Sequence, residues 1–435
     1  MISRQKRPDS APSRLFWVAL AVRLAYVVLA HMYRIRPYLD HFSFGWEMGR
    51  IGRALVTGYG FADPFHGHTG PTTWVGPAYP LIIAAVFKLF GIYTARSAFV
   101  LLALNCVLNA LMVRFVWEIA ARCFNNLSVT RWSAWLWALY PAAMQYAVKW
   151  IWEMTLTAFL FAWVLTLSLR MRNIGGTPEE AATAASTRRW LLFALLWGLI
   201  ALSNPSLLLF LPVNGAWIVA GYRNQRGGPG AQFANAMLAT VVFLACVAPW
   251  TYRNWRAFHH FIPMRGNFGV EFYLGNGPQS TGLLMAYDHP AQDPIELEHY
   301  RRMGELAYAK WRGELAKAYI RKDPVHFLNL CLRRLYFFWF GVPHPFDEGP
   351  LDEYGRLLNF QFTSIVGLLG LALALKRRVP AAGLFTWAFV LLPLVYYLVT
   401  VHARFRHPLE PLMTIFAVYL FHSAEKSWRV RWVAG

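Results

Sequence analysis

Residues 376–400 read KRRVPAAGLFTWAFVLLPLVYYLVT, with three cations followed, from Pro380 to Thr400, by 21 residues without a charge. A helix of about 20 apolar residues is long enough to cross the hydrocarbon core of a bilayer. Short loops rich in Lys and Arg stay on the cytoplasmic side of a membrane. The stretch therefore predicts a transmembrane helix that begins at the cytoplasmic face.

Further apolar runs on both sides of this stretch predict more spans. They lie at about 15–33, 98–121, 131–148, 151–170, 233–251, 357–375 and 409–422, with two more in 190–221, where Ser203-Asn204-Pro205 breaks the run. Proline removes a helix hydrogen bond and clashes with the preceding turn, so we expect a tight turn there. Because a backbone in lipid must satisfy its own hydrogen bonds, the sequence predicts an all-α polytopic membrane protein with about ten transmembrane helices.

The composition agrees with this fold class. Of the 435 residues, 57% are hydrophobic and 15% are charged, whereas soluble domains are about 45–50% apolar and about 25% charged. The apolar content also excludes a disordered chain. The formal net charge is +20. In so apolar a chain this charge favours membrane lipids and anionic lipid-linked substrates as partners, and no nucleic acid.

Two apolar segments are too short to cross the bilayer and carry internal cations. They are 77–91, with Lys88, and 326–342, with Arg333 and Arg334. We expect both to be amphipathic helices that lie at the membrane interface. When they are not counted as spans, every short basic loop falls on the cytoplasmic side, as the positive-inside rule requires.

This topology divides the chain into a few parts. A single transmembrane domain occupies 1–425, and 426–435 form a cytoplasmic tail. The outer face receives a loop at 34–97 and a longer segment at 252–356. Candidate functional residues are therefore sought in these two outer parts and at the outer ends of the spans.

Two carboxylates stand out in the first outer loop. Glu47 begins a predicted helix, since Met48 and Ile51 follow at helical spacing and Gly58 is a natural stop, and Asp40 precedes that helix. Partial desolvation at a cleft beside the membrane raises the pKa of a carboxylate and lets it act as a general base. The alternative is that both are solvated charges.

Cations and a further carboxylate lie at the outer ends of other spans. Lys149 and Glu153 lie at the outer junction of two spans, where an ionisable group at the level of the membrane costs free energy and is therefore a functional candidate. The alternative is that the two side chains pair along one helix. Arg404 and Arg406 precede His407 after the stretch quoted first. Their planar guanidinium groups suit a phosphate or pyrophosphate, and snorkelling to lipid headgroups is the alternative.

The second outer segment carries two more predicted features. Residues 267–276 alternate Phe, Val, Phe and Leu and predict a short strand or extended segment. Residues 296–322 predict a charged helix with a solvated face. No histidine or cysteine spacing matches a metal site, so we expect no cofactor; a divalent metal is not indicated, and the alternative of a metal requirement stays open.

In their order along the chain, these motifs resemble the GT-C superfamily of polytopic glycosyltransferases. The resemblance is to its bacterial branch of protein mannosyltransferases and lipid A aminoarabinose transferases. It rests on Glu47…Leu55-x-x-Gly58-x-Gly60, Pro77-Ala78-Tyr79-Pro80…Phe87-x-x-Phe90-Gly91, Pro249-Trp250…Arg253-Asn254…Gly275-Asn276 and Arg404-Phe405-Arg406-His407-Pro408…Pro411.

The resemblance implies the inverting transfer of a sugar from a polyprenyl-phosphate donor to a glycan, lipid or protein acceptor. The reaction is expected at the outer face of a bacterial inner membrane. Relatives carry their acid where Phe44 and Gly45 stand here, so Glu47 is the first choice for the base and Asp40 the second. The expected substrate-binding residues are Lys149, Glu153, Arg253, Asn254, Asn276, Arg404, Arg406 and His407.

Two other interpretations stay open. A transporter or flippase of lipid-linked sugars would use broken helices such as the turn at Asn204-Pro205. Against it stand the lack of an inverted repeat and the concentration of polar residues in one outer loop. A non-catalytic membrane scaffold would leave the outer carboxylates and arginines without a purpose.

Overall fold

Helices make up most of the computed structural model, which describes residues 11–35, 44–222, 228–283, 288–343 and 350–433. Within these ranges the only β pairing is an isolated bridge between Ala62 and Pro71. The expected all-α architecture is therefore confirmed.

Each expected span corresponds to one helix or to a broken pair of helices. They are α1 (Ala11–Leu29), α4 (Ala95–Phe124), α5 (Leu127–Leu139) with α6 (Pro141–Val148), α7 (Met154–Met171), α9 (Thr187–Ser203), η2 (Pro205–Phe210) with α10 (Leu211–Ala220), α11 (Gly228–Phe258), α16 (Pro350–Lys376), α17 (Ala382–Leu391) with α18 (Leu394–Leu398), and η4 (Ala403–Leu409) with α19 (Glu410–Val433). In the described chain, α1, α4, α7, α11 and α16 are each long and apolar enough to cross a bilayer unaided. The chain is a multi-pass membrane protein.

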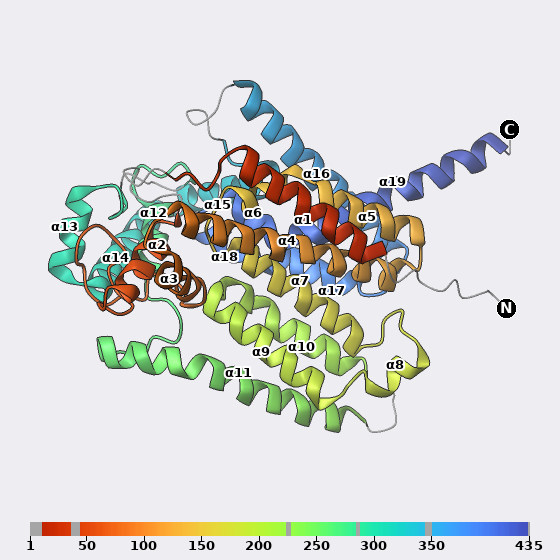
Figure 1. Ribbon diagram of the computed structural model, residues 1–435, viewed down its shortest axis with the longest axis horizontal. Coiled ribbons are helices and arrows are strands. Elements are labelled where there is room, and N and C mark those ends of the chain that lie inside the picture. Colours follow the sequence, from red (N-terminus) through yellow and green to blue (C-terminus); the bar gives the residue numbers. More distant parts are fainter. Residues whose placement is uncertain (1–10, 36–43, 223–227, 284–287, 344–349, 434–435) are drawn as a thin grey trace.

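The remaining helices lie at the two ends of this bundle (Figure 1). One end carries α2 (Glu47–Val56), α3 (Ala78–Phe90), α12 (Phe268–Asn276), α13 (Pro294–Met303) and α14 (Glu305–Lys322), and we call it the loop end. The short helix α8 (Pro178–Thr183) lies at the opposite end. The segments predicted for the outer face are thus separated from the short basic loop that holds α8. The two expected interfacial segments form α3 and α15 (Pro324–Phe340).

The prediction of a strand near residue 270 is wrong, because α12 is helical. Val270, Tyr273 and Leu274 are buried on one face of the helix, and the rings of Phe268 and Phe272 stack one turn apart with centroids 5.5 Å from each other. A run of four alternating apolar residues fits either period, and here the tertiary contacts select the helix. A side chain at Gly275 would collide with the backbone of Val399, so α12 packs directly against the end of α18.

The charged helical segment is also not a purely solvated face. Glu305 is 4% exposed. Its carboxylate accepts hydrogen bonds from the Thr73 amide at 2.6 Å, the Thr72 hydroxyl at 2.5 Å and the Tyr300 hydroxyl at 2.8 Å. Arg312 is equally buried and forms an ion pair with Glu296. The bonds to Thr72 and Thr73 tie α14 to the loop that follows α2, and those with Tyr300 and Glu296 tie it to α13.

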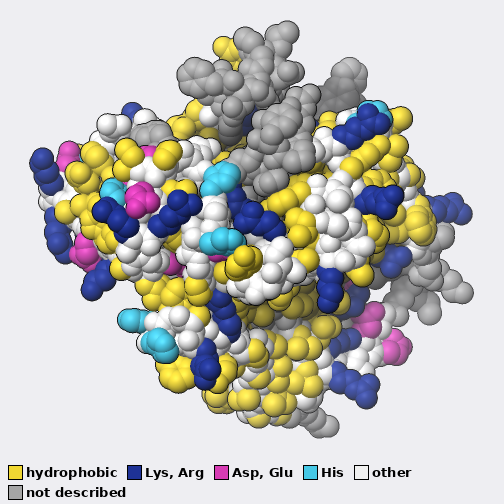
Figure 2. Space-filling model, turned by 60° about the vertical axis from the view of Figure 1, so that its left-hand side comes forward, with side chains coloured by type: hydrophobic (Ala, Val, Ile, Leu, Met, Phe, Trp, Pro, Cys, Tyr) yellow, Lys and Arg dark blue, Asp and Glu magenta, His cyan; other side chains and the backbone are white. Residues whose placement is uncertain are grey.

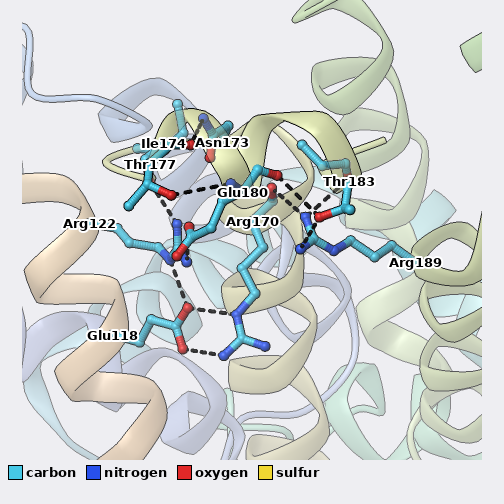
Figure 3. Close-up of polar contacts among 10 residues, drawn as sticks. Glu118, Arg122, Arg170, Asn173, Ile174, Thr177, Glu180, Thr183 and Arg189 are labelled. Carbon is cyan, nitrogen blue, oxygen red and sulfur yellow. Dashed lines mark hydrogen bonds and ion pairs between the residues drawn. The ribbon is translucent and has the colours of Figure 1, made fainter. Parts of the chain in front are cut away.

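The α8 end is closed by a cluster of ion pairs (Figure 3). Glu118 of α4 accepts hydrogen bonds from Arg122 at 2.7 Å and from Arg170 of α7 at 2.6 Å. Arg122 also pairs with Glu180 of α8 at 3.0 Å, and Arg189 donates to the carbonyl of Arg170. Cations of the predicted cytoplasmic loops therefore also hold those loops to the bundle.

Candidate functional site

A large cavity lies where the loop end meets the ends of several spans. Its volume is about 1780 Å³. Residues from the start of α2, the link from α6 to α7, the turn after α9, helix α12 and the link from α18 to η4 line it. In Figure 2, which brings the loop end forward, Lys, Arg and His side chains gather among hydrophobic ones on this face. The cavity unites several of the residues that the sequence singled out.

Glu47 is the first residue of α2 and lines the cavity. The preceding Gly45 has a φ of 74° and packs against the Trp152 ring so closely that no Cβ would fit. Burial raises the pKa of Glu47 from 4.5 to about 7, and the negative charge of Glu271 adds to this effect, while Arg50 and Arg404 oppose it. Glu47 is therefore a carboxyl group poised to exchange a proton near neutral pH.

Arg404 brings a cation into the same cavity. Its guanidinium carbon lies 3.7 Å from the centre of the Trp152 ring, in a cation–π contact. The charge of Arg404 interacts with Glu153, Glu47 and Glu271. The charge of one arginine is therefore influenced by three carboxylates that come from three separate segments.

Lys149 and Glu153 both line the cavity. The alternative of an ion pair along one helix is wrong, because Lys149 ends α6 and Glu153 precedes α7. Glu153 Oε2 is buried and has no hydrogen-bond partner in the described chain. Lys149 is exposed. A buried acceptor without a donor and a free ammonium group are features that a polar ligand would satisfy.

Glu271 and His289 line the cavity and were not among the site residues expected from the sequence. Glu271 of α12 accepts a hydrogen bond from Asn267 at 3.1 Å and lies 4.0 Å from Arg265. Burial raises the pKa of Glu271. His289 lies 3.7 Å from Glu47. No local pattern marks these residues, which the fold brings into one cavity with Glu47 of the other outer segment.

Arg253 and Asn254 do not line the cavity, and their expected role in substrate binding stays a prediction. Arg253 donates to the carbonyl of Thr72 at 2.7 Å and to that of Phe61. Asn254 is fully buried and donates to the carbonyl of Ile262 at 3.0 Å. Both side chains hold the outer loops against the end of α11.

Asn276 is likewise outside the cavity lining. Its amide donates to the carbonyls of Phe272 at 2.8 Å and Leu398 at 2.9 Å, and its oxygen accepts from Arg334 at 2.8 Å. These bonds fix the end of α12 to α18 and α15. In the structure Asn276 therefore supports the end of α12, and its expected substrate contact stays a prediction.

Arg406 and His407 are turned into the protein interior. Both are fully buried, as is Glu410. His407 Nδ1 lies 2.7 Å from Glu410 Oε2, and Arg406 Nη2 lies 3.5 Å from Glu410 Oε1. The expected phosphate contact of this pair stays a prediction, whereas the burial of Arg406 excludes the alternative of snorkelling to lipid.

Asp40, the second choice for the base, lies outside the described residues. In the part of the chain that the structure describes, no three His, Cys, Asp or Glu side chains are grouped so that they could hold a metal ion. The expectation of no cofactor stays a prediction.

Comparison with solved structures identifies the architecture. AglB, an oligosaccharyltransferase from Archaeoglobus fulgidus in complex with an inhibitory peptide and a dolichol-phosphate, matches 97% of this chain with a TM-score of 0.51 and 14% identity. The apo form of the Archaeoglobus fulgidus oligosaccharyltransferase matches 98% with a TM-score of 0.52 and 15% identity. The chain has the GT-C fold.

The GT-C fold here spans only about half the length of these oligosaccharyltransferases, 51% and 52%. The structure of ArnT from Cupriavidus metallidurans in the apo state is also similar, with 14% identity and a TM-score of 0.38. The match covers 94% of this chain and 78% of the ArnT chain. No family model matches the sequence, and the comparison with curated proteins finds no relative.

Proposed function

We propose that this protein is a membrane glycosyltransferase that moves a sugar from a polyprenyl-phosphate donor to an acceptor hydroxyl. The observation that carries the proposal is the meeting of Glu47 and Arg404 in one cavity of about 1780 Å³. A base for the acceptor and a cation for a phosphate leaving group are the two functions that such a transfer requires.

Glu47 is the proposed general base. A pKa of about 7 leaves a large carboxylate fraction at neutral pH and still allows the group to take a proton. The acceptor oxygen forms a bond to the anomeric carbon while its proton passes to Glu47. Attack from the side opposite the leaving group inverts the configuration at that carbon.

Arg404 and Lys149 are the proposed partners of the leaving group. The bond between the anomeric carbon and the phosphate oxygen breaks, and its electron pair leaves with polyprenyl phosphate. Cations placed where that negative charge develops stabilise the transition state. Arg404 is held in place by Trp152, while Lys149 has no ion-pair partner in the described chain and can turn to the phosphate.

Glu153 is the proposed contact for the sugar. Its unpartnered Oε2 can accept a hydrogen bond from a sugar hydroxyl. The anomeric carbon gains oxocarbenium character as the old bond breaks, and the carboxylates of Glu153 and Glu271 favour that positive charge. The Trp152 ring forms part of the cavity wall beside this carboxylate.

The donor class and the location belong to the same proposal. The AglB structure holds a dolichol-phosphate, which supports a lipid phosphate as the donor carrier for this GT-C fold. The α8 end holds Arg122, Arg170 and Arg189 (Figure 3), and such basic loops support a cytoplasmic position for that end. The cavity would then open at the outer face of a bacterial inner membrane, towards a glycan, lipid or protein acceptor.

Reconstitution in liposomes tests the proposed activity. The purified protein is supplied with a polyprenyl-phosphate sugar labelled in the sugar and with a mixed glycan and lipid acceptor fraction. A glycosyltransferase releases polyprenyl phosphate and labels the acceptor. A flippase moves the intact donor across the bilayer without cleaving it, and that result would contradict the proposal. A parallel reaction with chelator tests whether a divalent metal is needed.

A further inference from the structure

His289 is a buried histidine beside the proposed base. Its side chain is 6% exposed. The rings of Phe65 and Trp74 meet it edge to face, each with a centroid distance of 5.6 Å, and Trp46 lies beside it at 6.2 Å. This aromatic cage fixes the plane of the imidazole ring.

One hydrogen bond determines which ring nitrogen carries the proton. The backbone amide of Ala291 donates to Nδ1 of His289 at 3.0 Å. Nδ1 must therefore be the acceptor, and in the neutral ring the proton sits on Nε2. Burial lowers the pKa of His289 to about 3, and the nearby charge of Arg50 adds to the effect. At neutral pH the ring is uncharged and presents an Nε2–H.

That Nε2–H faces the carboxyl group of Glu47. The distance from Nε2 to Glu47 Oε1 is 3.7 Å, longer than a hydrogen bond but within the range that closes when substrate binds. Because the ring is neutral, the contact is not an ion pair. The other charged groups that act on Glu47 are Arg50 of its own helix, Glu271 of α12 and Arg404 of η4.

We propose that His289 is a positioning residue for Glu47: its Nε2–H donates to Oε1 and leaves Oε2 directed at the acceptor hydroxyl. The inference rests on the proposed function of Glu47 as the base. A carboxylate whose one oxygen is held by a neutral donor keeps a single orientation without losing its negative charge. Such a donor also favours the carboxylate over the carboxylic acid, so it lowers the pKa of Glu47.

The first test compares two substitutions at this position. His289→Phe keeps a flat ring and removes the donor, whereas His289→Gln supplies an amide N–H. We expect His289→Phe to lower kcat at least tenfold and to change the donor KM less than twofold. The acid limb, which is the fall of kcat/KM at low pH, should move up by about one pH unit. His289→Gln should recover most of the rate and the original limb.

His260→Phe is the matched control, because His260 is exposed and outside the cavity lining. Thermal melting in detergent establishes that each variant is folded. Equal loss in the Phe and Gln variants with an unchanged acid limb would mean that the ring only fills space, and it would overturn the proposal. Full activity of His289→Phe would do the same.

A second readout separates this inference from the proposed function. The carboxyl band of Glu47, assigned by its loss in Glu47→Gln, can be titrated by infrared difference spectroscopy without any substrate. If the protein shows no transferase activity, a higher Glu47 pKa in His289→Phe would still support the contact. An unchanged Glu47 pKa would overturn it, whatever the activity.

Discussion

The guanidinium group of Arg404 lies 3.7 Å from the centre of the Trp152 ring, and the same ring packs against Gly45 in the turn before the helix of Glu47. One indole therefore contacts both the proposed phosphate-binding cation and the segment that carries the proposed base. Packing at Trp152 therefore links the position of the proposed phosphate-binding cation to that of the proposed base.

Replacing Arg404 by lysine should weaken donor binding more than the preserved charge suggests. Lysine loses the planar fork and most of the contact with the Trp152 ring. We expect kcat/KM to fall about 10- to 100-fold in Arg404→Lys and about 10²- to 10³-fold in Arg404→Gln. Steady-state kinetics with varied donor measure this. Arg333→Lys, at an exposed position outside the cavity, is the control, and equal kinetics in all variants would contradict the role of Arg404.

The rate should depend on pH through Glu47. Its pKa is raised to about 7, and only the carboxylate can accept the acceptor proton. We therefore expect kcat/KM to rise about tenfold per pH unit below that pKa and to level off above it. A rate profile from about pH 5 to about pH 9 measures this limb. A profile that is flat through neutral pH would show that Glu47 is not the base.

The buried group of Arg406, His407 and Glu410 should govern stability and leave substrate affinity alone. Removing one partner of a buried ion pair costs about 3–5 kcal/mol, because the other charge is left without compensation. Glu410→Gln should therefore lower the melting temperature in detergent markedly. At a temperature where the variant is folded, its donor KM should equal that of the wild type. A large KM effect with unchanged stability would return Arg406 to the binding site.

Glu305 should control the order of the outer loop that it anchors. In Glu305→Gln an NH2 group replaces one of the two carboxylate oxygens that accept hydrogen bonds from Thr72 and Thr73. The lost acceptor should destabilise the loop by about 1–3 kcal/mol. We expect backbone amides in residues 61–74 to exchange hydrogen about tenfold faster or more. Glu314→Gln, on the exposed face of the same helix, is the control. Equal exchange in both variants would contradict the anchoring role.

Most of the fold could be predicted from the sequence. The spans follow from apolar length, and the breaks follow from residues such as Pro205, because both depend on local chemistry. The prediction of a strand near Val270 was wrong because four apolar residues are too few to distinguish the period of a strand from that of a helix. The burial of Glu305 was missed because its partners Thr72 and Thr73 lie far away in the sequence.

The candidate site could be predicted only in part. Arg404 and Arg406 are the same residue type and lie two positions apart, so the sequence alone cannot tell which of them faces the cavity. In η4 such neighbours point in different directions, and only the packing decides which one faces the cavity. His289 was missed because it lies in an irregular segment without periodicity, and its meaning comes from its contact with Glu47 alone.

The rate of polyprenyl phosphate release by Glu47→Gln in liposomes tests the central claim most directly. The glutamine keeps the size of the side chain and cannot accept the acceptor proton. We predict release about 10²- to 10⁴-fold slower than wild type, with an unchanged melting temperature, while the exposed control Glu298→Gln turns over at the wild-type rate. Release by Glu47→Gln at the wild-type rate would contradict the assignment of this cavity and its base.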